Sequence, residues 1–316
     1  MNLRDLEYLI AVADELHFHK AAEKCFVSQP TLSGQIKKLE DELGVLLIER
    51  TNRQVMMTDA GKAIVEQART VISGSKIIKE MAQSFDDPMQ CEIRLGLIPT
   101  VAPYLLPKIM KPLREQFPHL KLWLHEYQTH ILLEKLRCAE LDLLILALPI
   151  DKHEFSEWDL FKEPFWLALS PEDELANKPC VTLNDINHKE ILLLEEGHCL
   201  RDHALDVCYL AGASESDSFH ATSLETLRHM VGEGMGITLL PELAVPRPIV
   251  PRPIVPRPVV PQPVVPKKAN QEDNICYIPF TEPVPTRRIG MLFRKGSYRQ
   301  ETYQQIAEVI RTLFNH

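Results

Sequence analysis

The segment from Phe26 to Leu43 carries two stripes of side chains at helical spacing, and it constrains the fold more than any other part of the chain. The apolar stripe consists of Leu32, Ile36, Leu39 and Leu43. The polar stripe, on another face, consists of Gln29, Ser33 and Lys37. Ser28 is a favourable N-cap, and Pro30 is tolerated in a first helical turn. The segment is therefore predicted to be a helix that buries one face and leaves the other free to reach outward.

Short elements on both sides of this helix complete a winged helix-turn-helix pattern. Apolar-periodic segments at 3–15 and 19–25 precede it, and the apolar runs 45–48 and 55–57 follow it as the strands of a hairpin would. A domain of this kind inserts its last helix into the major groove of DNA and holds phosphates from the flanks. The alternative, a three-helix domain whose polar face is merely solvated, leaves the coincidence of cap, stripe and wing unexplained. The predicted DNA-contacting residues are Gln29, Pro30, Thr31, Ser33, Lys37, Arg50 and Arg53.

Composition limits the partners and the chemistry. The chain of 316 residues has a formal net charge of −9, and residues 1–60 hold ten acidic against seven basic side chains, so any DNA contact must come from a local basic face. The amino terminus lacks a signal-peptide pattern and no apolar stretch reaches the length of a membrane span, so we expect a cytoplasmic protein without a membrane partner. Seven scattered cysteines without a CxxC motif predict no disulfide framework, no metal site and no cofactor.

Beyond the wing the apolar pattern changes twice. Residues 59–88 contain a long amphipathic helix with no domain of its own to fold against, so it is predicted to pair with a second copy. From Cys91 onward, short apolar runs alternate with helical segments, which is typical of an α/β sheet. The expected strands are 93–98, 120–126, 143–148, 165–169, 191–194, 236–240, 275–278 and 288–293.

Three positions fall where ligands of open α/β folds bind, at the carboxyl ends of strands. Thr100 follows the first expected strand, Thr129 follows the second, and Gly197 follows the run 191–194. Each threonine, taken alone, is more often a helix cap than a ligand contact. Both interpretations stay open at this point.

Residues 246–266 are a low-complexity insert of repeated Pro-Arg-Pro-Ile-Val and related units. Proline at this density excludes a helix or a central strand and favours polyproline II. The insert is either a docking segment for a proline-binding or acidic partner, or a tolerated expansion of a surface loop. We favour the expansion.

The stretch from Gly197 to Cys208 carries the most reactive chemistry. Cationic neighbours and a helix N-terminus lower the pKa of a thiol, and His198 and Arg201 are candidates for that role beside Cys199. If the stretch is helical, the Cα atoms of Cys199 and Cys208 lie roughly 12 to 14 Å apart. A disulfide needs less than about 7 Å, so the two could bond only if the segment unwinds. The simpler interpretation is two unrelated thiols on a surface helix.

Residues 1–61 resemble the winged helix-turn-helix of the LysR-type transcriptional regulators. The matching elements are Phe18…Ala21-Ala22, Ser28 to Ser33, Ile36…Leu39-Glu40, Leu43-Gly44 and Arg50…Arg53. Gly34 departs from the pattern, because many members carry arginine there. The resemblance implies a DNA-binding domain (1–58), a dimerising linker helix (59–88) and an α/β regulatory domain (89–316) of two Rossmann-like subdomains, similar to periplasmic binding proteins. Subdomain I is expected at 89–162 and 268–316 and subdomain II at 163–267, hinged by paired crossovers near 163 and 268.

Within that family the chain resembles the members that sense hydrogen peroxide. The resemblance rests on Gly197 to Cys208, Ala221 to Leu227, Gly236 to Pro241 and Arg287 to Gly290. It implies that Cys199 is the peroxide-reactive thiol, that Cys208 is its disulfide partner, and that Thr100, Thr129, His198 and Arg287 lie near the peroxide. It also implies promoter DNA, RNA polymerase, a thiol reductant such as glutaredoxin and further copies of the chain, as a dimer of dimers, as partners in activating oxidative-stress defence genes.

Two other functions remain possible at this stage. One is a LysR-type regulator that answers to a small metabolite, with incidental cysteines. The other is a thiol peroxidase-like enzyme, against which the sequence offers no nucleotide-binding glycine motif for a reductant. A regulator rather than an enzyme is therefore predicted.

Overall fold

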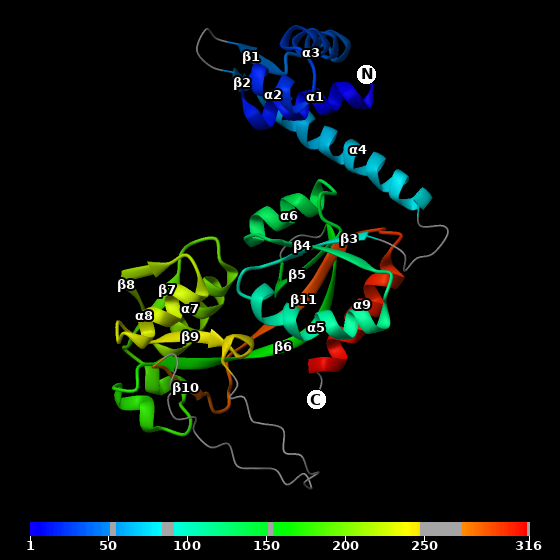
Figure 1. Cartoon of the computed structure of the whole chain (residues 1–316). Helices are drawn as coiled ribbons and strands as arrows, with labels where there is room; N and C mark the ends of the chain where they lie inside the picture. Colours follow the sequence, from blue (N-terminus) through cyan, green and yellow to red (C-terminus); the bar gives the residue numbers. More distant parts are fainter. Residues whose placement is uncertain (51–54, 84–91, 151–153, 247–273, 315–316) are drawn as a thin grey trace. The chain divides into compact units, whose positions relative to one another are not determined.

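The computed structural model describes residues 1–50, 55–83, 92–150, 154–246 and 274–314 (Figure 1). Arg53 and nearly all of the Pro-rich insert lie outside the described residues. The chain divides into two compact units, one of residues 1–88 with 134–141 and one of residues 89–133 with 142–316. In the part of the chain that the structure describes, no helix is both long and apolar enough to cross a membrane.

The first unit contains the predicted three helices and hairpin. Its elements are α1 (Leu3–Glu15), α2 (Phe18–Lys24), α3 (Gln29–Leu43), β1 (Ile48–Arg50), β2 (Val55–Met57) and α4 (Asp59–Gln83). The Ser28 hydroxyl accepts the Thr31 amide at 3.3 Å and so caps α3. Leu32, Ile36 and Leu39 are buried in the core of the unit, as the apolar stripe predicted. The polar stripe is thereby left on the outer side of α3.

The second unit is α/β, as predicted. Its strands are β3 (Glu92–Leu97), β4 (Lys121–Glu126), β5 (Leu143–Leu148), β6 (Phe155–Leu169), β7 (Glu190–Leu194), β8 (Ser214–Ala221), β9 (Thr238–Pro241), β10 (Cys276–Pro279) and β11 (Thr286–Arg294). Its helices are α5 (Ala102–Gln116), α6 (Thr129–Arg137, of which residues 134–137 belong to the first unit), α7 (Cys199–Ala211), α8 (Leu224–Gly232) and α9 (Gln300–Phe314), with short 3-10 turns η1 (Glu174–Asn177), η2 (Leu183–Ile186) and η3 (Glu242–Ala244). Eight of the strands overlap the predicted runs, whereas β8 was not predicted.

One long strand, β6, joins the two halves of this sheet (Figure 1). The main sheet has the order β10-β6-β11-β5-β3-β4, in which β3 is parallel to β4 and β5. The first part of β6 pairs with β11, and its last part pairs with β9 and β10. The return from the second half to the first therefore falls between β10 and β11, later in the chain than the expected position near 268.

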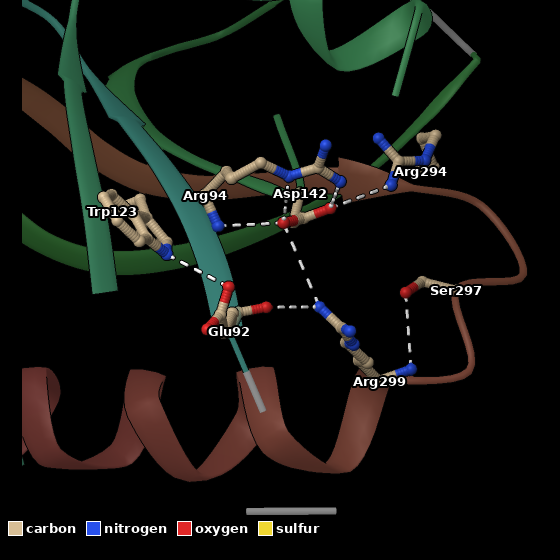
Figure 2. A network of polar contacts seen from close by, with 7 residues as sticks. All are labelled: Glu92, Arg94, Trp123, Asp142, Arg294, Ser297 and Arg299. Atoms are coloured by element: carbon tan, nitrogen blue, oxygen red, sulfur yellow. Dashed lines mark hydrogen bonds and ion pairs between the residues drawn. The ribbon is translucent and has the colours of Figure 1, made fainter. Parts of the chain in front are cut away.

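The amino ends of β3 and β5 are held together by a buried carboxylate, Asp142 (Figure 2). Arg94 donates to it from its backbone amide at 2.8 Å and from Nε and Nη2 at 3.0 and 2.7 Å. Arg294 and Arg299 approach the same carboxylate at 3.5 and 3.9 Å. The three guanidinium groups around the Asp142 carboxylate compensate the cost of removing its charge from water. We regard this cluster as structural, because it lies at the end of the parallel strands opposite to the one where ligands of such folds bind.

Candidate functional site

Cys199 is the first residue of α7, and Cys208 follows nine residues later on the same helix. Both thiols are free. At a rise of about 1.5 Å per residue, their Cα atoms lie roughly 13 Å apart. That is about twice the longest separation a disulfide can span. The predicted helical separation of the two thiols is therefore present in this structure, and they can join only if α7 unwinds.

The loop before α7 meets the carboxyl ends of the parallel strands. Gly197 has φ +93°, and a Cβ there would lie 2.8 Å from the Gln128 side chain, so glycine is required both for its conformation and for the close approach. Gln128 immediately precedes Thr129, the first residue of α6. This contact brings Thr129 towards Cys199, and the backbone of Ala147, near the end of β5, hydrogen-bonds to the same thiol.

The half-buried Cys199 thiol lies in an environment with opposing effects on its pKa. Burial raises the pKa. The Arg287 guanidinium lowers it, as do the Thr129 side chain and the Ala147 backbone, while Asp202 raises it. The N-terminal position on α7 also favours an anion there. The thiolate form is thus supported by groups from four separate segments of the chain.

Arg287, the cation of this site, is buried completely. Its Nη1 donates to the Thr100 hydroxyl and its Nη2 to the Thr100 carbonyl oxygen, both at 3.0 Å. Its Nε donates to Glu163 Oε2 at 2.8 Å. Thr100, Arg287 and Cys199 therefore share one site, as the resemblance implied for these three residues.

Neither threonine acts as a helix cap. Val101, not Thr100, is the N-cap of α5, and the Thr100 hydroxyl accepts from Arg287 instead. The Thr129 hydroxyl lies close enough to Cys199 to lower its pKa, yet among the described residues this buried oxygen has no hydrogen-bond partner of good geometry. A buried hydroxyl without a partner costs about 1–3 kcal/mol.

His198 and Arg201, the two candidates for lowering the pKa of Cys199, have other partners in the structure. Burial lowers the pKa of His198 and so disfavours its charged form, and the ring hydrogen-bonds to the backbone of Thr222. Arg201 forms a bidentate ion pair with Glu215, at 2.7 and 2.9 Å. The cation that acts on Cys199 is Arg287, 88 positions further along the chain.

His203 and Glu163 contribute to the site and were not predicted. His203 Nδ1 lies 2.6 Å from the Cys199 carbonyl oxygen, and its Nε2 lies 3.3 Å from the Leu148 carbonyl oxygen at the end of β5. This ring links the first turn of α7 to the other half of the sheet. Its position four residues after Cys199 is the spacing at which helical side chains reach back, a signal that could have identified it.

Cys208 lies in a different environment. Its side chain is buried in the apolar core beneath α7. Burial and the nearby Glu215 carboxylate raise the pKa of this thiol to about 11. It is therefore protonated at neutral pH for as long as α7 stays folded.

The predicted DNA-contacting residues lie on the outer side of α3 and on the wing. Gln29, Pro30, Thr31 and Lys37 are exposed, and Ser33 is half-buried. Arg50 ends β1, and Arg53 lies outside the described residues. The departing residue Gly34 is exposed, and a Cβ there would meet nothing within 4 Å, so a larger side chain fits at this position. Among the described residues there is no group of three or more His, Cys, Asp or Glu side chains that could hold a metal ion.

Comparison with known proteins identifies the family. Residues 3–62 match the bacterial regulatory helix-turn-helix proteins of the lysR family, and residues 87–268 match the LysR substrate binding domain. The chain belongs to the LysR family of regulators. Within it, the chain is 49% identical over 311 residues to the DNA-binding transcriptional dual regulator OxyR of Escherichia coli K12, which covers 98% of this chain and 95% of that protein.

Solved OxyR structures resemble the chain along its whole length. A full-length OxyR from Pseudomonas aeruginosa with the substitution C199D has a TM-score of 0.72 and 36% identity, covering 100% of this chain and 97% of that one. An H2O2-bound cysteine-to-serine variant of Corynebacterium glutamicum OxyR has a TM-score of 0.62 and 29% identity, covering 99% and 94%. The resemblance predicted from the sequence is therefore confirmed.

Proposed function

We propose that this protein is a LysR-type transcriptional regulator that senses hydrogen peroxide through reversible formation of a Cys199–Cys208 disulfide. The observation that carries the proposal is the contrast between the two thiols. Cys199 lies at a helix N-terminus among a buried cation and hydroxyl donors, and its potential partner is held away from it in the core. Its relatives named OxyR, including the one bound to H2O2, support the same function.

In the first step the Cys199 thiolate attacks one oxygen of hydrogen peroxide. The S–O bond forms, the O–O bond breaks, and hydroxide leaves with the electron pair, so that the sulfur becomes a sulfenic acid. The Thr129 hydroxyl can donate to and accept from the peroxide, because a hydroxyl does both. Arg287, fixed by Thr100, stabilises the negative charge of the departing hydroxide, which takes up a proton to become water.

In the second step the Cys208 thiol attacks the sulfenic sulfur. The S–S bond forms, the S–O bond breaks, and the sulfenic hydroxyl leaves as water with the proton of the Cys208 thiol. Because α7 holds the two Cα atoms roughly 13 Å apart, this step requires the helix to unwind between them. The rearranged segment then alters how copies of the chain assemble, and hence which promoter DNA contacts α3 and the wing make.

We propose for the chain the same partners that its family resemblance implies. The chain acts as a dimer of dimers joined through α4, binds promoter DNA in the cytoplasm, where the chromosome lies, and recruits RNA polymerase. A thiol reductant such as glutaredoxin returns the disulfide to two thiols. The reaction is stoichiometric in peroxide, and the protein is not an enzyme.

The test is the peroxide response of Cys199→Ser in the full-length protein. Brief exposure to micromolar hydrogen peroxide, followed by alkylation and mass mapping, is expected to give a 199–208 disulfide in the parent and none in the variant. DNA binding by the reduced variant should be unchanged. Cys180→Ser is the matched control, because Cys180 is another half-buried thiol outside the site. A normal response in Cys199→Ser would overturn the proposal.

A further inference from the structure

We propose that Glu163 is a positioning residue for the reaction of Cys199 with hydrogen peroxide, acting through Arg287. This inference rests on the proposed function. Glu163 lies on β6 directly opposite Arg287 on β11. The exposed fraction of the Glu163 side chain is 2%, and that of Arg287 is 0%. No solvent reaches this pair, so each charge depends on its protein partners.

Both oxygens of the Glu163 carboxylate have a buried donor. Oε2 accepts from Arg287 Nε at 2.8 Å, and Oε1 accepts from the backbone amide of Leu243 at 2.9 Å. The amide of Leu243 belongs to η3, so the carboxylate is fixed by a rigid backbone group rather than by another flexible side chain. The position of the Glu163 carboxylate therefore does not depend on Arg287 alone.

The bond to Nε sets the orientation of the whole guanidinium group. A guanidinium is planar and its donors form a rigid fork, so holding Nε also aims Nη1 and Nη2. These two nitrogens are the ones that meet Thr100 at 3.0 Å each, and the same group acts on Cys199. Glu163 thus determines how the donors of Arg287 face the place where peroxide reacts.

A positioning role and a purely electrostatic role predict opposite results. Glu163 is an anion, so removing its charge while Arg287 stays in place makes the surroundings of Cys199 more positive. That change favours the thiolate and speeds its reactions. If Glu163 instead aims Arg287, its removal lets the guanidinium turn, and the reaction with peroxide slows even when Cys199 is fully ionised.

The experiment measures two rate constants at Cys199, across pH, in the reduced full-length protein. One is the reaction with hydrogen peroxide, and the other is alkylation by iodoacetamide, which needs a thiolate but no aimed donor. In Glu163→Gln the amide offers one acceptor oxygen to two donors, so either Arg287 Nε or the Leu243 amide loses its bond. The peroxide rate at the high-pH plateau is expected to fall by about tenfold or more. Alkylation compared at equal thiolate fraction should be unchanged.

Two further variants separate geometry from charge and from folding. Glu163→Asp keeps the charge but shortens the side chain by one methylene, and the peroxide rate should fall in this variant as well. Glu157→Gln is the matched control, because Glu157 pairs at 3.1 Å with the exposed Arg288 on the same two strands. It should react at the parent rate.

Failure of the positioning role and failure of the proposed function give different results. A faster peroxide reaction in Glu163→Gln, a normal rate in Glu163→Asp, or an equal loss of alkylation in both variants would overturn the positioning role. If the parent protein itself failed to react with peroxide at Cys199, the proposed function would fail instead. A low melting temperature of Glu163→Gln leaves Glu163→Asp to decide, because the aspartate keeps a negative charge beside the buried Arg287.

Discussion

Cys199 and Cys208 lie on one helix, and burial raises the pKa of both, yet their surroundings differ in almost every other respect. Cys199 begins α7, where the helix dipole, Arg287 and nearby donors favour the thiolate. Cys208 lies about two and a half turns later, in the apolar core, where the Glu215 carboxylate adds to the rise of its pKa. One helix thus carries a thiol whose ionised form is stabilised by its neighbours and a thiol whose ionised form is disfavoured by its neighbours.

This difference between the two thiols predicts an order of events. On the proposed function Cys199 reacts first, because Arg287, the Thr129 side chain and the Ala147 backbone oppose the rise that burial causes in its pKa. Cys208 becomes a useful nucleophile only after it leaves the core, which is also the movement that brings it to Cys199. We therefore expect the conformational change to follow oxidation.

Replacing Cys208 should abolish the disulfide and leave the oxidation of Cys199 unchanged. In Cys208→Ala, peroxide should still oxidise Cys199 to the sulfenic acid at the parent rate, because the surroundings of Cys199 are intact. The disulfide cannot form. Labelling with a sulfenic-acid-specific reagent measures the first step, and mass mapping measures the second. Loss of the sulfenic acid in this variant would mean that Cys208 takes part in the first step.

Arg287→Gln should reduce the peroxide rate of Cys199 by about 100-fold, because it removes the cation that stabilises the departing hydroxide. The Thr100 hydroxyl also loses its donor. Arg288→Gln is the control, since Arg288 is an exposed neighbour on the same strand that pairs with Glu157 and Asp159. Stopped-flow measurement of both variants checks the prediction. Equal rates in the two would remove Arg287 from the mechanism.

The pH dependence of stability should reveal the burial of Cys208. Its pKa rises from 9.0 to about 11 in the folded protein, so the folded state binds this proton more tightly than the unfolded state does. The stabilisation is present below pH 9 and is lost as the pH rises towards 11. Urea unfolding of reduced parent and Cys208→Ala at several pH values isolates the contribution. A parent curve parallel to that of the variant between pH 8 and 11 would contradict the buried state of this thiol.

Removing the His203 ring should have a smaller effect, because it only weakens the contacts that hold the first turn of α7. In His203→Ala the contacts to the Cys199 and Leu148 carbonyl oxygens are lost, so the helix should unwind more readily. Disulfide formation from the sulfenic acid should accelerate about two- to tenfold, the range for one hydrogen bond. The first step should keep its rate. His229→Ala, an exposed histidine on α8, is the control.

The sequence predicts local structure well and distant pairing poorly. The cap at Ser28 and the apolar stripe of α3 are local, and both appear in the structure as predicted. Strand β8 was not predicted because Ser214 to Ser218 lack an apolar alternation. The partnership of Glu163 with Arg287 joins residues 124 positions apart, which no spacing rule reaches. The partners of His198 and Arg201, which are Thr222 and Glu215, were not predicted for the same reason, since they lie outside α7.

Amide hydrogen exchange over residues 199–208 can show whether Cys199 and Cys208 join only when α7 unwinds. In the reduced protein these amides should exchange slowly, as in a packed helix. After peroxide treatment, mass mapping should find the disulfide, and the same amides should exchange at rates near those of an unfolded chain. A disulfide formed with helical protection unchanged, or two free thiols after oxidation, would contradict the account.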